Sequence, residues 1–230
     1  MWLRDRVAVA GYAVALQCTT RAEISPVKTT KPDPSSRNQV KCQIHPLTRD
    51  RWADFEKLFG KNGACAGCWC MWWRLPQAQW RAQKGEINRR AMRQLVRDGS
   101  PPGLLAYADG KPVGWCAIGP REAYPRFNHS RVLKPVDDQP VWSVTCFFVA
   151  RAYRRRGLTV QLLDAAAKFA REHGAKILEG YPTEPKRDQP DAFVYTGLAS
   201  AFRQTSFQEV ARRSPARPIF RRELKRSRRQ

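Results

Sequence analysis

A cluster of arginines stands immediately before an expected helix and predicts a binding site. Arg151 and the arginines at 154–156 precede Gly157, and apolar residues then recur at helical spacing from Val160 to a stop at Gly174. The N-terminus of a helix offers unpaired backbone N–H groups and the positive end of the helix dipole, so it binds anions, above all phosphates. The turn therefore predicts a pyrophosphate site, in which Gly157 allows close approach of the backbone. A solvated basic turn is the alternative.

Cysteines and tryptophans are concentrated in residues 65–73, which read Cys-Ala-Gly-Cys-Trp-Cys-Met-Trp-Trp. Thiolates at this spacing suit a zinc ion or a redox pair, because they can share one metal or reach one another. A closed zinc site needs four ligands, however, and no second Cys-x-x-Cys or His-x-His pair follows Cys65, Cys68 and Cys70. We therefore expect no metal, and the role of these three cysteines stays open.

The hydrophobic spacing around these residues indicates a mixed α/β fold. Asp109-Gly110 between two apolar runs is the strongest short-range hairpin signal, and the polar, proline-interrupted residues 119–140 are typical of a long loop. The helix after Gly157 connects two expected strands, and such a βαβ unit makes them parallel. The expected strands are 40–44, 103–107, 112–118, 141–149, 175–181, 207–212 and 218–224, and the other expected helices start near Asp50 or span 86–96 and 192–204.

The stretch from Phe148 to Thr159 resembles the acyl-coenzyme A binding motif of the GNAT-type N-acetyltransferase superfamily, which reads Gln/Arg-x-x-Gly-x-Gly/Ala after a hydrophobic strand. Arg154 and Gly157 match this pattern, whereas Thr159 stands where Gly or Ala is usual. The order of elements over residues 40–224 is similar to the same superfamily. The resemblance implies a mixed, mostly antiparallel central sheet with one parallel pair from the βαβ unit, flanked by helices.

The resemblance also implies acetyl-CoA as the co-substrate. In such proteins the pantetheine arm pairs like an extra strand with the splayed edge of the central strand, here residues 146–149, and the diphosphate binds N–H groups of the turn. The extra arginines could meet the 3′-phosphate of the coenzyme. The implied cofactor-binding residues are Phe147, Phe148, Val149, Arg154, Arg155, Arg156, Gly157, Leu158 and Thr159.

Acetyl transfer needs a neutral amine, which relatives often prepare with a Glu on the central strand. Residues 141–149 contain no Glu, and their polar members are Ser143 and Thr145. Glu179 on the next strand is the candidate base, and Glu122 in the preceding loop is the other acidic side chain nearby.

The leaving thiolate needs a proton, which the resembled enzymes usually take from a Tyr in the last helix. Aligning Ser206-Phe207 with the family's Gly-Phe places Phe202 at that position, so the sequence departs from the family where the acid should be. Tyr195 lies two helical turns earlier and is the candidate acid. A partly buried core phenol, with the thiolate protonated from solvent, is the alternative.

In the resembled fold, the segment after the first helix forms part of the wall on the acceptor side. Trp69, Trp72 and Trp73 would then line an aromatic substrate pocket. Plain packing in the core is the other interpretation of these residues.

The composition favours anionic partners without choosing among them. The 230 residues include 42 Lys+Arg and 20 Asp+Glu, which gives a net charge of +22 that lies mostly in the body of the chain. We do not expect nucleic acid as the main partner, since no helix-turn-helix, zinc finger or RNA-binding strand motif is recognisable. No window approaches the roughly 18 apolar residues of a membrane span, and seven cysteines in a chain of this length favour a reducing compartment, hence the cytoplasm.

We therefore expect residues 1–39 to be a flexible or misassigned extension, 40–224 to be an N-acetyltransferase domain, and 225–230 to be a basic tail. The expected function is transfer of an acetyl group from acetyl-CoA to a primary amine of a small molecule, or of a protein as second choice. A catalytically silent coenzyme A-binding protein of the same fold and a basic nucleic-acid-binding module are the alternatives. We expect no membrane partner, and a homodimer stays open.

Overall fold

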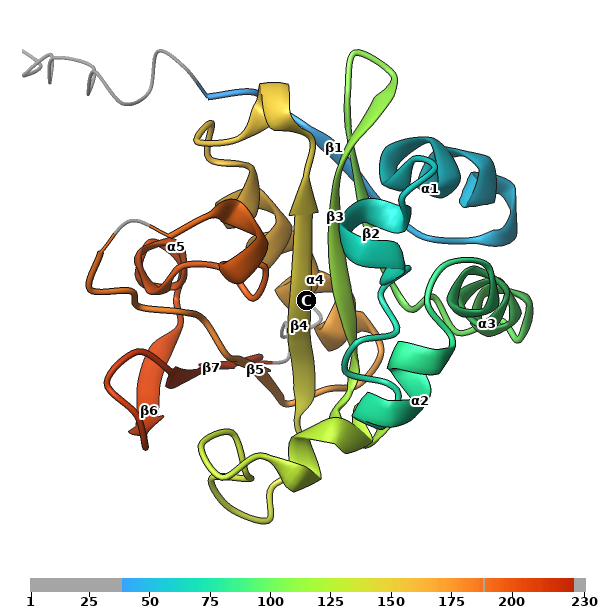
Figure 1. Ribbon diagram of the computed structural model, residues 1–230. Coiled ribbons are helices and arrows are strands. Elements are labelled where there is room, and N and C mark those ends of the chain that lie inside the picture. Colours follow the sequence, from blue (N-terminus) through green and yellow to red (C-terminus); the bar gives the residue numbers. More distant parts are fainter. Residues whose placement is uncertain (1–38, 188, 226–230) are drawn as a thin grey trace, which may run out of the picture. The chain divides into compact units, whose positions relative to one another are not determined.

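The computed structural model describes residues 39–187 and 189–225 (Figure 1). The predictions for residues 1–38 and for 226–230 lie outside the described residues. Within the described ranges, no helix is both long enough and apolar enough to cross a membrane.

Seven strands form one sheet in the order β1-β2-β3-β4-β5-β7-β6. Their bounds are β1 Gln43–Pro46, β2 Gly103–Ala108, β3 Lys111–Pro120, β4 Trp142–Val149, β5 Ile177–Gly180, β6 Gln208–Arg212 and β7 Pro218–Glu223. Among the described strands, β4 and β5 are the one parallel pair, and all other neighbours are antiparallel. The predicted mostly antiparallel sheet with one parallel pair is confirmed.

The hairpin of β2 and β3 turns at the predicted dipeptide. Asp109 and Gly110 have φ angles of 49° and 70°, both in the left-handed region. A two-residue turn of this hand matches the twist of the flanking strands, and Asp-Gly is one of the pairs that adopt it most readily. The turn therefore sets the register in which Ala108 faces Lys111.

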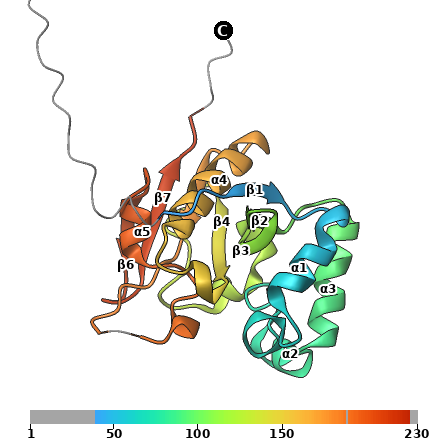
Figure 2. The same ribbon diagram turned by 90° about the horizontal axis from the view of Figure 1, so that it is seen from above.

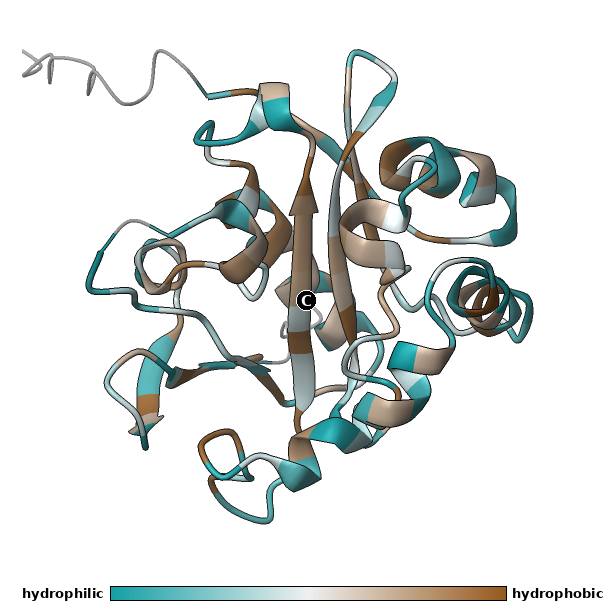
Figure 3. Ribbon diagram, viewed as in Figure 1, coloured by the Kyte–Doolittle hydropathy of each residue, from teal (hydrophilic) through white to brown (hydrophobic). Residues whose placement is uncertain are grey.

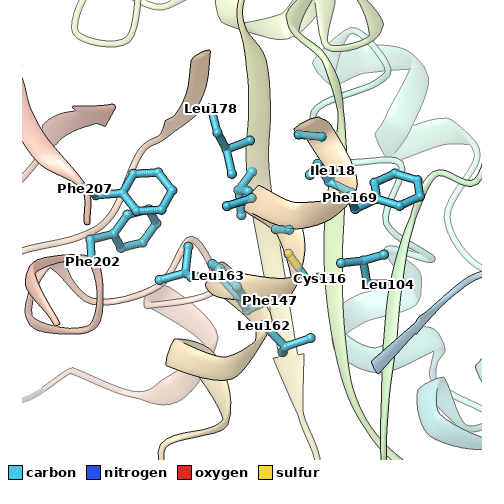
Figure 4. Packing of buried hydrophobic residues seen from close by; sticks show 14 of the residues in the cluster. Leu104, Cys116, Ile118, Phe147, Leu162, Leu163, Phe169, Leu178, Phe202 and Phe207 are labelled. Atoms are coloured by element: carbon cyan, nitrogen blue, oxygen red, sulfur yellow. The ribbon is translucent and has the colours of Figure 1, made fainter. Parts of the chain in front are cut away.

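Helices cover both faces of the sheet (Figure 2). Their bounds are α1 Trp52–Phe59, α2 Gln77–Ala82, α3 Glu86–Arg97, α4 Leu158–Glu172 and α5 Ala199–Arg203. On one face, Leu162 of α4 and Phe202 of α5 pack in the same cluster as Cys116 of β3 (Figure 4). On the other face, Phe55 of α1 packs against Trp115 of β3 with ring centroids 5.0 Å apart. The sheet is therefore buried on both sides, which explains the apolar runs of β3 and β4 (Figure 3).

The central strand β4 separates from its parallel neighbour halfway along its length. It pairs with β5 only over Trp142, Ser143 and Val144. Its register with β3 shifts between Ala117 and Ile118, so that one extra residue, Thr145, forms a bulge. From this point to Val149 the edge of β4 that would face β5 has no neighbouring strand.

The last helix is shorter than the sequence predicts. Instead of a helix over 192–204, a short 3-10 turn spans Asp191–Phe193 and α5 begins only at Ala199. Gly197 interrupts the helix with a φ of 85°, and Thr183 bonds to both sides of the break, donating its N–H to the Gly197 carbonyl and accepting the N–H of Ala199. The break leaves Tyr195 in a loop.

Candidate functional site

A cleft of about 1170 Å³ opens along the free part of β4. Most of its lining comes from three parts of the chain: the end of β4 with the turn into α4, residues within 185–204, and the segment that follows α1. The lining includes every residue that the resemblance implied for cofactor binding: Phe147, Phe148, Val149, Arg154, Arg155, Arg156, Gly157, Leu158 and Thr159.

The turn into α4 has the geometry of an anion-binding site. Gly157 precedes Leu158, the first residue of the helix, with a left-handed φ of 75° that strains any residue carrying a Cβ. Arg155 shares this region with a φ of 58°. Because the first N–H groups of a helix lack partners within the helix, those of Leu158 and Thr159 are free to bind an anion in the cleft.

Arg154 forms hydrogen bonds to two separate parts of the cleft lining. Its Nε donates to the Val149 carbonyl at 3.0 Å, and its Nη1 donates to the Asp191 carboxylate at 2.6 Å. Asp191 is the one acidic residue of the described lining, and this ion pair offsets its charge. Arg155 also lines the cleft and adds a guanidinium group to its end at the start of α4.

Part of the free edge of β4 is already hydrogen-bonded. The Phe147 N–H donates to the carbonyl oxygen of Tyr195 at 2.6 Å, and the Val149 carbonyl accepts from Arg154. Because N–H and C=O groups of alternate residues point to the same edge of a strand, the Phe147 carbonyl and the Val149 N–H also point into the cleft. A ligand pairing with β4 would use these two groups, which is less than the whole edge expected from the sequence.

Tyr195 lies in the wall of the cleft, opposite the end of β4. Burial raises the pKa of its phenol to about 12, and the neighbouring Cys146 adds to this effect. Arg217 and Arg126 act in the opposite direction. The phenol is therefore protonated throughout the physiological pH range and can donate a hydrogen bond.

An aromatic wall forms the other side of the cleft, but its members differ from the expected ones. Trp72 and Trp73 line the cleft, and Trp80 of α2 joins them. Trp69 does not line it: this side chain is 6% exposed and stacks on Phe59, with ring centroids 5.7 Å apart. The chain turns through left-handed residues at 69 and 70, so helical or strand periodicity gave no guide to which indoles point outward.

Arg126, from the residues between β3 and β4, contacts Trp72 of this wall. Its guanidinium carbon lies 3.6 Å from the centre of the Trp72 ring, and its Nη1 donates to the Trp72 carbonyl at 2.9 Å. The Trp72 ring also meets Tyr195 edge-on, with centroids 6.4 Å apart. The sequence showed no signal for Arg126, because residues 119–140 have no periodicity to place them.

Glu179 is buried in a network of ion pairs and is not among the residues that line the cleft. It is 1% exposed, and one carboxylate oxygen accepts from Arg121 at 3.2 Å and from the Tyr181 hydroxyl at 2.6 Å. The other oxygen accepts from Arg221 at 2.7 Å. Two guanidinium groups therefore hold this carboxylate, and none of its hydrogen-bond partners lines the cleft.

The remaining polar candidates are divided between core, surface and cleft. Ser143 is buried and hydrogen-bonded to Tyr181 at 2.9 Å, and Glu122 is exposed on a 3-10 turn. Thr145, at the bulge of β4, lines the cleft. Phe202 is fully buried against Phe147 and Phe207 (Figure 4) and has no proton to donate.

Thiols line the cleft from β4 and from the segment after α1. Cys146 alternates with Phe147 and so faces the aromatic wall, where its sulfur lies 3.5 Å from that of Cys70. Cys65 and Cys68 line the cleft as well. No group of three or more metal-ligating side chains that could hold an ion occurs within the described residues. The two-residue period of β4 was the signal that could have identified Cys146.

A model of the acetyltransferase (GNAT) family matches residues 69–190, a little more than half of the chain. This range contains residues 69–73 of the cysteine- and tryptophan-rich segment, the hairpin, β4, the basic turn and α4. No curated protein matches the sequence at a significant level.

Solved structures are similar to this chain over about four-fifths of its length. A GNAT-family acetyltransferase from Listeria monocytogenes is 12% identical with a TM-score of 0.50, and the alignment covers 80% of this chain and 96% of that one. The paia N-acetyltransferase of Thermoplasma acidophilum, in complex with coenzyme A, is 12% identical with a TM-score of 0.46 and coverages of 80% and 99%. The protein yncA of Salmonella typhimurium, solved with its cofactor acetyl-CoA, is 12% identical with a TM-score of 0.46 and coverages of 81% and 96%.

Proposed function

Because the chain belongs to the acetyltransferase (GNAT) family, we propose that it transfers an acetyl group from acetyl-CoA to a primary amine of a small molecule, by direct attack in a ternary complex. The observation that carries this proposal is one cleft that joins an anion-binding helix start, the free edge of β4 and an aromatic wall. A protein amino group is the alternative acceptor.

The residues of the cleft suit coenzyme A, which supplies the acetyl group as an activated thioester. The N–H groups at the start of α4, together with Arg155, would hold its diphosphate. The Phe147 carbonyl and the Val149 N–H would pair with the amides of its arm. The Asp191 carboxylate does not prevent binding of the diphosphate, because its charge is offset by Arg154.

Tyr195 would act as a hydrogen-bond donor to the leaving thiolate. Its pKa of about 12 lies well above the roughly 8.5 of an ordinary thiol. Complete transfer of the phenolic proton to a thiolate would thus be uphill by about 5 kcal/mol. Stabilisation of the negative charge by a donor that keeps its proton remains favourable, and the proton that the amine loses goes to the thiolate or to water.

The acceptor must lose a proton before it attacks, and no carboxylate or histidine of the described lining stands ready to take it. Asp191, the one acidic member, is held by Arg154 at the other end of the cleft. We therefore propose that the amine binds in its neutral form, drawn from the small neutral fraction in solution.

The positive charges near the aromatic wall limit which amines can bind there as the acceptor. Arg126 and Arg217 both act on the Tyr195 phenol, and their hydrogen bonds go to neutral groups, the Trp72 carbonyl and the hydroxyls of Thr183 and Thr196. A second positive charge on the acceptor would be repelled here. We therefore propose an amine with an aromatic or apolar part and no further cationic group.

The test is calorimetry with acetyl-CoA near physiological salt, followed by an assay of thiol release with a panel of amines. The panel pairs aromatic monoamines such as phenylethylamine with polyamines such as spermidine. Binding together with thiol release that favours the monoamines supports the proposal. Absence of binding contradicts it, and binding without thiol release from any amine supports a catalytically silent coenzyme-binding protein instead.

A further inference from the structure

Two cysteines from distant parts of the chain meet at the floor of the cleft. Cys70 follows the strained segment after α1, and Cys146 lies on β4 beside the free edge; their sulfur atoms are 3.5 Å apart. Both residues line the cleft, where Cys146 is partly exposed and Cys70 is buried. The separation is van der Waals contact between two reduced thiols and lies about 1.5 Å above the S–S bond length of a disulfide.

The segment that carries Cys70 is held in an unusual backbone conformation. Non-glycine residues Ala64, Ala66, Trp69 and Cys70 all have positive φ angles, of 65°, 51°, 34° and 53°. Each costs of order 1–3 kcal/mol, and such strain persists only where the surroundings enforce it, which is common at functional sites.

Cys70 is kept in place by a specific partner. The indole N–H of Trp115, buried in β3, donates to the Cys70 sulfur at 2.7 Å. This hydrogen bond directs one side of the sulfur to Trp115 and leaves another side facing Cys146. The position of Cys146 is set in turn by the pairing of β4 with β3, in which it lies opposite Ala117.

We propose that Cys70 and Cys146 form an oxidisable dithiol, which a peroxide converts into a disulfide that crosses the floor of the cleft. Cys146, the more exposed of the two, reacts first: its sulfur attacks the peroxide, the O–O bond breaks, and a sulfenic acid and one water form. The Cys70 sulfur then attacks the Cys146 sulfur, the S–O bond breaks, and a second water leaves. Two thiols and hydrogen peroxide thus give one disulfide and two waters.

The disulfide would join the aromatic wall to β4 one residue from Phe147. On the proposed function, this is the acceptor end of the cleft, whereas the basic turn at 154–159 lies at the other end. Oxidation is therefore expected to lower amine acetylation more than tenfold and to leave acetyl-CoA binding unchanged, and a reductant is expected to restore activity. In the reducing cytoplasm expected from the sequence, such disulfides are usually transient and sensory.

The experiment treats the full chain with hydrogen peroxide, blocks the remaining thiols and maps disulfides by mass spectrometry of peptides. The expected result is a peptide that links Cys70 to Cys146, absent from both Cys70→Ser and Cys146→Ser and kept in Cys42→Ser, whose thiol lies outside the cleft. A link from Cys70 to Cys68, or oxidation of Cys146 without any cross-link, would overturn the proposal.

The mapping is independent of catalysis, so the two proposals fail separately. If the link forms while the reduced protein acetylates no amine, the dithiol stands and the proposed function fails. If the reduced protein is active, the oxidised protein is expected to retain less than a tenth of its activity at unchanged affinity for acetyl-CoA. The Cys70→Ser and Cys146→Ser variants are expected to lose this sensitivity to peroxide, and loss of activity that persists in both would contradict the inference.

Discussion

The backbone N–H of Phe147 donates a hydrogen bond to the carbonyl oxygen of Tyr195 across 2.6 Å. This bond ties the loop before α5 to the free edge of β4, at the place where the strand has left β5. It holds the Tyr195 phenol beside Cys146 and Trp72, although the three residues come from separate parts of the chain. The hydrogen bond therefore assembles the reacting end of the proposed site.

Tyr195→Phe removes the phenolic donor and keeps the backbone bond to Phe147. A hydrogen bond to a charged group contributes about 1.5–3 kcal/mol, so kcat is expected to fall about ten- to hundredfold with the dissociation constant of acetyl-CoA unchanged. Steady-state kinetics and calorimetry measure the two quantities. An unchanged kcat would indicate that Tyr195 lines the cleft without taking part in catalysis.

Gly157→Val places a branched side chain where φ is 75°, at the point where the anion should approach. We expect the affinity for acetyl-CoA to fall more than about tenfold, which is 1.4 kcal/mol. Gly174→Val is the matched control, since Gly174 ends the same helix with a φ of 83° and has open space around it. Equal losses of affinity in the two variants would mean that backbone strain alone, and not an anion site, explains the effect.

Glu179→Gln removes the charge that Arg121 and Arg221 share. Breaking a buried pair costs about 3–5 kcal/mol, and we expect the lower end because Arg221 keeps its ion pair with Asp137. Denaturant unfolding should show this loss of stability, while the folded fraction keeps its kcat. A large loss of kcat at unchanged stability would instead identify Glu179 as the base.

The variants Trp72→Ala and Trp69→Ala test which of the two tryptophans contributes to the cleft and which to the core. Trp72 faces the cleft, so its loss is expected to raise KM for aromatic amines severalfold and to leave KM for acetyl-CoA unchanged. Trp69 is buried against Phe59, so its loss is expected to lower the free energy of unfolding by about 3–5 kcal/mol. Similar kinetic and stability effects in both variants would contradict this division.

The pH dependence of kcat/KM should follow the fraction of the acceptor amine that is neutral. An alkylamine with a pKa near 10.4 gains about tenfold in its neutral fraction with each pH unit, so log kcat/KM is expected to rise with a slope near 1 from pH 7 to 9. Because burial raises the pKa of Tyr195 to about 12, its phenol keeps its proton over this range and causes no decline. A plateau above about pH 7 would indicate a carboxylate or histidine base.

Local patterns in the sequence were sufficient for much of the fold. The Asp109-Gly110 turn, the alternation along β4 and the helix after Gly157 are each specified within a few residues, because backbone preferences and hydrophobic spacing act over short distances. The end of β4 and the basic turn were therefore predicted residue by residue, and all of those residues line one cleft.

The tertiary structure alone decided which side chains face that cleft. Trp69 and Trp72 are indistinguishable by composition, yet a left-handed turn buries one and exposes the other to the cleft. Glu179 stands on the predicted strand, but two arginines from distant segments hold it in a structural ion pair. Cys70 meets Cys146 across 76 residues of sequence. Such contacts depend on the packing of the whole sheet and its helices, which no short stretch of the chain encodes.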